Sequence, residues 1–349
     1  MVKIDIHKNS SSKIADVNFA ELGFGNFFSD HFFQANFENN EWNSLEIKPM
    51  QNLSIHPGNS TLHYGQAVFE GLKAYRKENN TIQLFRPEKN IERFNKSAVR
   101  LCMPQVPKEL FLTAIKKLVN LDHMWVPKRA FGALYIRPFM IANESFLGVR
   151  PAEKYSFFII LSPVGSYYNK PLRVKVEKNY TRAIKGGIGS AKAAANYAAS
   201  LYPMNEAKKE GYDQLVWTDG KNHENIEELG TANFFAVINN QLFTPKVSDS
   251  ILEGVTRDSV IKIARDLGYE VHTDGLSIEK LKEAYRNGQL TECFSTGTAA
   301  VISSISSIQF DDLKASFDHS FPIGNKLKQT LMDIQFGSAK DIFGWTENI

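Results

Sequence analysis

A stretch rich in proline, glycine and serine near the middle of the chain limits the possible folds most strongly. Residues 162–171 read SPVGSYYNKP, a composition typical of a link between domains. Strand-like and helix-like segments alternate on both sides of it without a regular βαβ rhythm, which favours two α+β domains over a doubly wound sheet. We expect a smaller N-terminal domain (1–163), an interdomain loop (164–175) and a larger C-terminal domain (176–349).

Local signals place several elements within these domains. Pro87 suits the first position of a helix, and the apolar residues after it recur at helical spacing. A second helix is expected from about Ala193 to a C-cap at Gly211. Asn239-Asn240 predicts a tight hairpin turn, because asparagine tolerates positive φ. Thr256 and Ser277 are expected to cap two further helices.

The composition excludes several classes of protein. Hydrophobic residues make up 43% of the 349 residues and charged residues 23%, as in ordinary globular proteins. A net charge of +3 gives no reason to expect nucleic acid or a membrane surface as partner. The most apolar stretch, Phe157–Leu161, is far shorter than the ~20 residues of a membrane span. Cys102 and Cys293 have no metal or redox spacing, and residues 1–13 have no apolar signal core, so we expect a cytoplasmic protein without a metal.

Lys192 is the first candidate for chemistry. It follows the glycine-rich loop KGGIGS (185–190) and lies among small residues. Small neighbours let a planar group approach the backbone, and an apolar pocket lowers the pKa of a lysine toward the range that imine formation requires. A surface lysine at a helix start fits the same local pattern. A nucleotide-binding loop fits poorly, because Ala191 and Ala193 stand where that motif has glycine and Ser or Thr.

Three further segments are chemically suggestive but ambiguous when each is taken alone. Glu227-Glu228 precedes an apolar strand and reads equally as a solvated turn. Thr256 begins a helix, where free N–H groups can bind an anion, or is only a cap. The small residues 295–300 read STGTAA and form either a plain turn or a nest of N–H groups for a carboxylate.

An arginine in the first half of the chain also needs a partner. Tyr135 and Arg137 alternate along a predicted strand and therefore face the same way. A substrate carboxylate or an internal acidic residue would satisfy Arg137 equally well. Arg93 lies off the apolar stripe of its helix and, by itself, is expected to be exposed to solvent.

These signals, in this order, resemble the branched-chain amino acid aminotransferases, which belong to the fold type IV class of pyridoxal-phosphate enzymes. The resemblance runs over nearly the whole chain. It is carried by Gly23-Phe24-Gly25, His63-Tyr64-Gly65, Phe69-Glu70-Gly71-Leu72-Lys73-Ala74, Leu84-Phe85-Arg86-Pro87, Tyr135-Ile136-Arg137-Pro138, Pro163-Val164-Gly165, Lys192, Asn196-Tyr197, Glu228, Gly230, Gly254-Val255-Thr256-Arg257, Gly297-Thr298-Ala299, Asp333-Ile334-Gln335-Phe336-Gly337 and Trp345-Thr346.

The resemblance implies a two-domain α+β fold whose larger domain is built on a β-barrel-like sheet with helices. It also implies roles around pyridoxal 5'-phosphate. Lys192 would hold the cofactor covalently and move a proton, and Glu228 would pair with the pyridine nitrogen. Tyr197 would bind the phenolic oxygen. The phosphate would be held by four residues: Arg93, Val255, Thr256 and Thr298.

For the substrate, the resemblance implies a carboxylate site at Thr298-Ala299 and a side-chain pocket beside Arg137. The aromatic lining of that pocket would comprise Phe24, Tyr64, Tyr135 and Tyr167. Leu147 and Val149 would reach the partner's site in a homodimer. The implied reaction moves the amino group of L-leucine, L-isoleucine or L-valine to 2-oxoglutarate. The alternatives are a D-amino acid aminotransferase, an aminodeoxychorismate lyase or, from another class, a phosphate- or nucleotide-binding module.

Overall fold

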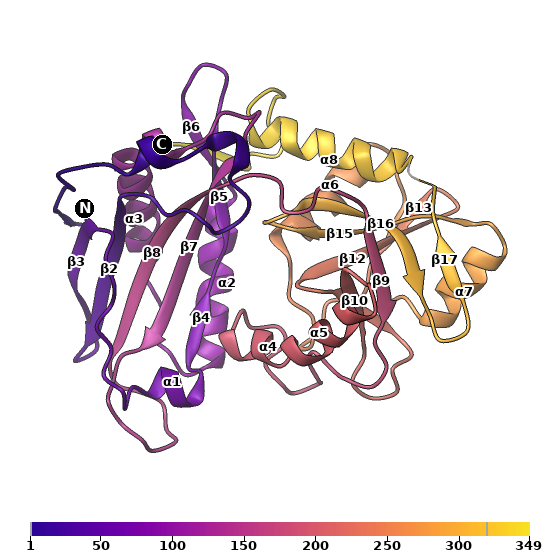
Figure 1. Ribbon diagram of the computed structural model, residues 1–349, viewed down its shortest axis with the longest axis horizontal. Helices are drawn as coiled ribbons and strands as arrows, with labels where there is room; N and C mark the ends of the chain where they lie inside the picture. Colours follow the sequence, from indigo (N-terminus) through magenta and orange to yellow (C-terminus); the bar gives the residue numbers. More distant parts are fainter. Residues whose placement is uncertain (1, 319) are drawn as a thin grey trace. The chain divides into compact units, whose positions relative to one another are not determined.

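The computed structural model describes residues 2–318 and 320–349, which fall into two compact units (Figure 1). Unit 1 comprises the described residues as far as Tyr167, together with Ala191–Ala195 and Asp333–Ile349. Unit 2 comprises Tyr168–Ser190 and the described part of Asn196–Met332. Met1, the first residue of the predicted N-terminal domain, lies outside the described residues.

Unit 1 is built on a sheet with the strand order β1-β3-β2-β8-β7-β5-β6-β18, and β4 pairs with β7. The strands are β1 (Asp5–Ile6), β2 (His31–Glu38), β3 (Glu41–Pro49), β4 (Ala67–Phe69), β5 (Leu72–Arg76), β6 (Ile82–Phe85), β7 (Ala133–Ala142), β8 (Tyr155–Val164) and β18 (Thr346–Asn348). Neighbouring strands are antiparallel except β1 and β3. The long β7–β8 pair lies in the middle of this order.

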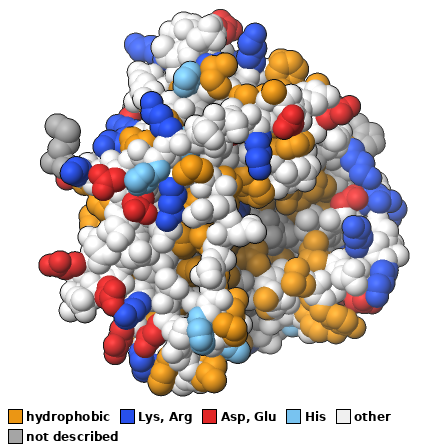
Figure 2. Space-filling model, turned by 60° about the vertical axis from the view of Figure 1, so that its left-hand side comes forward, with side chains coloured by type: hydrophobic (Ala, Val, Ile, Leu, Met, Phe, Trp, Pro, Cys, Tyr) orange, Lys and Arg blue, Asp and Glu red, His pale blue; other side chains and the backbone are white. Residues whose placement is uncertain are grey.

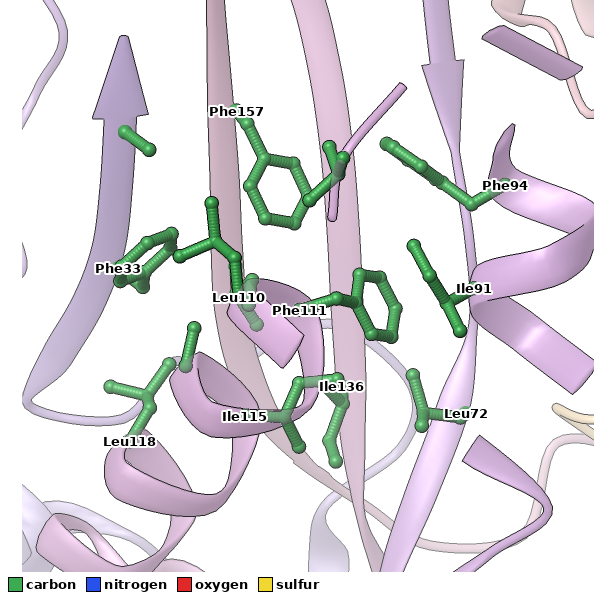
Figure 3. Packing of buried hydrophobic residues seen from close by; sticks show 14 of the residues in the cluster. Phe33, Leu72, Ile91, Phe94, Leu110, Phe111, Ile115, Leu118, Ile136 and Phe157 are labelled. Atoms are coloured by element: carbon green, nitrogen blue, oxygen red, sulfur yellow. The ribbon is translucent and has the colours of Figure 1, made fainter. Parts of the chain in front are cut away.

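The helices of unit 1 pack against that sheet. They are α1 (Ser60–Tyr64), α2 (Pro87–Arg100), α3 (Lys108–Leu121) and short 3-10 helices at Ile14–Asp16, Phe19–Glu21 and His123–Trp125. Phe94 of α2 and Phe111 of α3 meet Phe157 of β8 at ring-centroid distances of 5.5 and 6.0 Å in the core (Figure 3). The predicted helix start at Pro87 is confirmed, because Ile91, Phe94 and Ala98 recur at helical spacing and are buried.

Unit 2 is built on a second sheet, with the order β11-β10-β9-β16-β15-β12-β13-β14 and β17 paired with β16. Its strands are β9 (Leu172–Val176), β10 (Gln214–Thr218), β11 (Ile226–Leu229), β12 (Ala232–Ile238), β13 (Gln241–Phe243), β14 (Val271–His272), β15 (Leu290–Gly297), β16 (Val301–Gln309) and β17 (Lys314–Ser316). Because β11 also pairs with β12, the strands from β11 round to β12 close into a ring. The β-barrel-like sheet implied by the resemblance is confirmed.

The remaining helices are α4 (Ala194–Ala198), α5 (Leu201–Lys209), α6 (Val255–Asp266), α7 (Ile278–Arg286) and α8 (Pro322–Gln335). The single helix predicted from about Ala193 to Gly211 is therefore wrong. Pro203 lies in the first turn of α5, and its ring would clash with the carbonyl of residue 199 in a continuous helix. The chain breaks before it instead.

Two other local predictions are confirmed. Asn239 and Asn240 have φ values of 50° and 60°, which is the geometry of a tight hairpin between β12 and β13. Ser277 caps α7 by accepting a hydrogen bond from the N–H of Lys280 at 3.1 Å. In both places the local chemistry of the side chain determines the backbone.

The division of the chain differs from the predicted ranges at three places: after Tyr167, at Ala191–Ala195 and from Asp333 onward. Strand β8 extends into the proline-containing stretch as far as Val164, which pairs with Ala133, and the division falls after Tyr167. The segment from Asp333 onward belongs to unit 1, because β18 pairs with β6 and the N–H of Arg86 donates to the carbonyl of Trp345 at 2.7 Å. Long-range strand pairing of this kind leaves no local sequence signal.

The face shown in Figure 2 carries charged side chains of both signs. On the face in Figure 2, basic and acidic side chains are interspersed and neither sign forms a continuous field. Within the described residues, no helix is long and apolar enough to cross a bilayer, and no group of three or more His, Cys, Asp or Glu side chains is arranged to hold a metal ion.

Candidate active site

The backbone of Lys192 is fixed within unit 1 by two elements. Its N–H donates to the hydroxyl of Ser97 on α2 at 2.8 Å, and its carbonyl accepts from the N–H of Phe69 on β4 at 3.0 Å. The next residue, Ala193, forms a β-bridge with Val68. The Lys192 ammonium lies 4.8 Å from the centre of the Phe69 ring. A lysine held in this way is not the loosely placed surface lysine that the local sequence also allowed.

The glycine-rich loop before Lys192 directs its N–H groups at the protein. The N–H of Gly186 donates to the carboxylate of Asp249 at 2.7 Å, and that of Ser190 donates to the carbonyl of Asp249 at 2.8 Å. A carboxylate beside these N–H groups would repel a phosphate. The structure therefore supports the rejection of a nucleotide-binding loop.

Arg93 forms an ion pair with Glu70 on the adjoining segment of unit 1. Its Nε lies 2.6 Å from Oε1 and its Nη2 lies 2.9 Å from Oε2 of Glu70, whose side chain is 0% exposed. The expectation that Arg93 is exposed is wrong, because its side chain is only 11% exposed. Burial raises the pKa of the Glu70 carboxyl, but the charge and hydrogen bonds of Arg93 and the charge of Lys192 outweigh burial and hold the pKa below its ordinary value.

Aromatic residues gather beside Arg137 in unit 1. The Phe24 ring makes edge contacts with Tyr135 at 5.0 Å and with Tyr167 at 4.9 Å. The Arg137 Nη2 donates to the Tyr135 hydroxyl at 3.0 Å, and the guanidinium carbon lies 4.7 Å from the centre of the Phe69 ring. Tyr135 and Arg137 thus lie side by side, as their alternation along the strand predicted.

Arg137 has no acidic partner among the described residues. Its Nε is buried and makes no hydrogen bond within that part of the chain. A guanidinium stacked on aromatic rings with an unsatisfied donor is suited to a carboxylate from outside the protein. Tyr64 makes neither of the Phe24 contacts: its ring contacts His63, and its hydroxyl donates to the carbonyl of Leu147.

Gly71 provides the space that Tyr135 occupies. A Cβ at this glycine would lie 1.9 Å from the Tyr135 hydroxyl oxygen, which is well inside van der Waals contact. The glycine of the Phe69-Glu70-Gly71 motif is therefore required by the packing of a neighbouring strand.

Within unit 2, Glu228 lies on β11 and is buried. Its Oε2 forms an ion pair with the Nε of Arg182 at 2.9 Å, and its Oε1 accepts from the N–H of Leu252 at 2.9 Å. The neighbouring Glu227 points the opposite way, accepts from the Ser250 hydroxyl and has a pKa raised by burial. The solvated turn that the sequence allowed at Glu227-Glu228 is thus excluded. Arg182 carries no motif, and sequence reasoning missed it.

The predicted anion site at Thr256 lies at the N-terminus of α6. The structure makes Gly254 the N-cap and places Thr256 in the second helical position, so the expected cap is wrong by two residues. A Cβ at Gly254 would lie 2.0 Å from the Asn233 Oδ1, which explains a glycine at this cap. Val255 and Thr256 still contribute first-turn N–H groups, which have no intrahelical acceptor.

The predicted small-residue turn lies between the antiparallel strands β15 and β16 of unit 2. Thr298 and Ala299 occupy it, and the next strand begins with Val301 at a φ of 62°, which a β-branched residue rarely adopts. The hydroxyl of Thr296 is buried and makes no hydrogen bond within the described residues. Strain and an orphaned polar group favour a ligand site at this turn. Tyr197 lies half-buried on α4 of the same unit.

Comparison with known proteins places the chain in a family. Residues 67–308 match the family described as amino-transferase class IV. A probable branched-chain-amino-acid aminotransferase of Staphylococcus epidermidis is 44% identical over 350 residues, covering 98% of this chain and 97% of the relative. Branched-chain-amino-acid transaminase 1 of Bacillus subtilis is 45% identical over 338 residues, covering 95% of each chain.

Solved structures agree. The branched-chain amino acid aminotransferase of Escherichia coli has a TM-score of 0.74 at 27% identity, covering 91% of this chain and 98% of its own. That of Thermobaculum terrenum in its PLP form has a TM-score of 0.75 at 26% identity, with coverages of 91% and 98%. The chain belongs to the class IV aminotransferases.

Proposed function

We infer that this chain is a branched-chain-amino-acid aminotransferase. It transfers the amino group of L-leucine, L-isoleucine or L-valine to 2-oxoglutarate, and the reverse. The observation that carries the substrate assignment is Arg137, which lies against aromatic rings without an acidic partner among the described residues. Relatives with this printed activity, similar over nearly their full length, support the same conclusion.

The residues of each unit fit pyridoxal 5'-phosphate as cofactor. Bound pyridoxal phosphate supplies an electron sink for the charge that develops when the substrate Cα loses its proton. Lys192 would hold the cofactor and carry that proton on its Nζ. Glu228 would pair with the pyridine nitrogen, and the ion pair with Arg182 and the hydrogen bond from the N–H of Leu252 hold its carboxylate in place.

Other residues would orient the cofactor. Tyr197 would donate to the phenolic oxygen. Arg93 would bind the phosphate as a fixed cation, while Val255 and Thr256 would bind it through first-turn N–H groups of α6 and Thr298 through its hydroxyl. The orphaned hydroxyl of Thr296, two residues before Thr298, supports a ligand at this turn.

Substrate recognition combines an apolar pocket with one cation. The N–H groups at Thr298-Ala299 would bind the α-carboxylate. The rings of Phe24, Tyr135 and Tyr167 would line the aliphatic pocket, and Tyr64 remains a proposed fourth member. Burying the second carboxylate of 2-oxoglutarate unpaired is prohibitive. Arg137 at the edge of the rings neutralises that carboxylate without filling the aliphatic space.

We also propose a cytoplasmic homodimer. Leu147 and Val149 are 66% and 87% exposed on a loop of unit 1, and exposed apolar side chains on one loop suit a partner surface. The free thiols of Cys102 and Cys293 suit a reducing compartment. Sedimentation of the wild type and of a Leu147→Ser/Val149→Ser double variant tests the dimer, because a loop at the interface weakens association when it is made polar.

One absorbance titration tests the proposed activity. The purified enzyme loaded with pyridoxal phosphate is given L-leucine and then 2-oxoglutarate. We expect the visible cofactor band to fall with L-leucine and to return with 2-oxoglutarate. A band that responds only to D-alanine would contradict the substrate assignment. The absence of any band after reconstitution would contradict the role of Lys192.

A further inference from the structure

Glu70 is a buried acid to which the proposed reaction assigns no role. It follows β4 directly and is wholly buried. In addition to the two Arg93 nitrogens, it accepts from the Asn90 side-chain amide at 2.8 Å and from the N–H of Gly71 at 3.0 Å. Four donors on one carboxylate fix its position and keep it ionised.

The contact with Glu70 also fixes the plane of the Arg93 guanidinium. A guanidinium has five N–H donors in a rigid fork. The Nε and Nη2 contacts with Glu70 use one edge of that fork, so the opposite edge is held in a set direction. The orientation of Arg93 therefore depends on Glu70, and not only on its place on α2.

Helix α2, which carries Arg93, and strand β4, which precedes Glu70, also hold Lys192. Ser97, one turn after Arg93 on α2, accepts from the Lys192 N–H and donates to the Arg93 carbonyl at 2.9 Å. Phe69, the neighbour of Glu70, donates to the Lys192 carbonyl. Glu70, Arg93 and Lys192 thus belong to one hydrogen-bonded framework within unit 1, and the positive charge of Lys192 contributes to the low pKa of Glu70.

We propose that Glu70 is a positioning residue with two tasks: it orients Arg93 toward the cofactor phosphate, and it places a compensating negative charge beside Lys192. This inference rests on the proposed function, because it presumes that Lys192 and Arg93 hold pyridoxal phosphate. A merely structural Glu70 would influence the free energy of unfolding alone, so the test measures properties that stability does not control.

The first test compares two ligands on Glu70→Gln apoenzyme. Glutamine accepts from only one Arg93 donor and turns its amide toward the other. We expect affinity for pyridoxal 5'-phosphate to fall about tenfold to a hundredfold, the range for a hydrogen bond to a charged group, and affinity for unphosphorylated pyridoxal to fall much less. Glu92→Gln is the matched control, because Glu92 lies exposed on the same helix and pairs with Lys89. Equal losses for both ligands overturn the first task.

The second test follows the pH midpoint of the visible band. Removing the Glu70 charge disfavours a protonated nitrogen on Lys192, so Glu70→Gln lowers the midpoint by about one unit. Arg93→Gln raises it, and the double variant returns near the wild-type value. The double variant also leaves no buried charge unpaired, so it keeps the test decisive if Glu70→Gln does not fold. Identical midpoints in the double variant and Arg93→Gln overturn the second task.

The two failures remain distinguishable. If the wild type and Glu92→Gln both lack the visible band, the proposed function is wrong and the inference falls with it. If both show the band and Glu70→Gln matches them in phosphate affinity and midpoint, only the inference is wrong.

Discussion

Each unit contains a largely buried arginine–glutamate ion pair among its described residues. The two pairs differ in which member is the proposed ligand group. In unit 1 the proposed ligand group is Arg93, and Glu70 is its supporting partner in the ion pair. In unit 2 the proposed ligand group is Glu228, and Arg182 is its supporting partner in the ion pair. In each pair the supporting partner supplies the opposite charge, and in unit 1 Glu70 also accepts two hydrogen bonds from Arg93.

The comparison shows which residues of a site a sequence motif identifies and which it leaves out. The family resemblance assigned an expected role to the proposed ligand group of each pair, Arg93 and Glu228. The supporting member of each pair had no role assigned, although both are ion-paired and their side chains are 0% and 9% exposed. A fixed charge beneath a ligand group is as much a part of the site as the group itself.

The largest effect is expected from Arg182→Met, which leaves Glu228 buried without its counter-charge. Breaking one side of a buried pair costs about 3–5 kcal/mol of unfolding free energy. Denaturation in urea measures this loss. The double variant Arg182→Met/Glu228→Gln should recover most of the stability and none of the activity. A double variant as unstable as the single one would show that the charge of Arg182 is not what matters.

Arg137→Ala extends the comparison to an arginine that, unlike Arg93 and Arg182, has no carboxylate partner among the described residues. We expect the KM for 2-oxoglutarate to rise about tenfold to a hundredfold, as for a lost hydrogen bond to a charge, with little change for L-leucine. Steady-state kinetics with each substrate measures the split. Arg129→Ala is the control, because Arg129 also stacks on a ring but pairs with Asp333. Equal losses for both substrates contradict the role of Arg137.

Gly71→Ala tests whether the packing of Tyr135 against Gly71 contributes to stability and to the role of Arg137. The new methyl group would overlap the Tyr135 hydroxyl, and overpacking costs about 1–3 kcal/mol. Thermal unfolding should show that loss, and the KM for 2-oxoglutarate should rise because Tyr135 no longer contacts Arg137. A second change, Tyr135→Leu, removes the hydroxyl and the ring carbons that would lie 1.9–3.2 Å from the new methyl group, and should restore part of the stability of Gly71→Ala. Failure to restore it would mean that another contact is responsible.

The smallest effect is expected at Asp219, a carboxylate held without any arginine. It accepts from the N–H groups of Asn222, Glu224 and Asn225 at 2.7–3.0 Å. Burial raises its pKa, but these backbone hydrogen bonds outweigh burial and lower the pKa to about 2. The stabilisation is therefore complete above the ordinary pKa of 3.8 and is lost as the pH falls toward 2. Asp219→Asn should be less stable than the wild type at neutral pH, and the difference should disappear in acid; a difference independent of pH contradicts this.

Local features of the fold could be predicted from the sequence. Proline at a helix start and asparagine at positive φ act through their own backbones, so Pro87 and Asn239-Asn240 were placed correctly. The closing of the second sheet and the return of residues 346–348 to β6 depend on partners far away in sequence. No local pattern specifies such partners.

The candidate site divides in the same way. Lys192 and Arg137 stood out because their neighbours were unusual for a lysine and an arginine. Glu70 and Arg182 did not, because a charged residue in an ion pair inside the protein has the same local sequence as one exposed to solvent. Only the partner reveals the difference, and the partners of these two residues lie 23 and 46 positions away.

The pairing of β18 with β6 has a consequence for biosynthesis. The ribosome makes β18 after the whole of unit 2, so the nascent sheet of unit 1 has an unpaired edge at β6 while unit 2 is being translated. An open edge is where strands from other chains can attach. We expect chains on densely loaded polysomes to be most exposed to misassembly in that interval, which ends when residues 346–348 leave the ribosome and pair with β6.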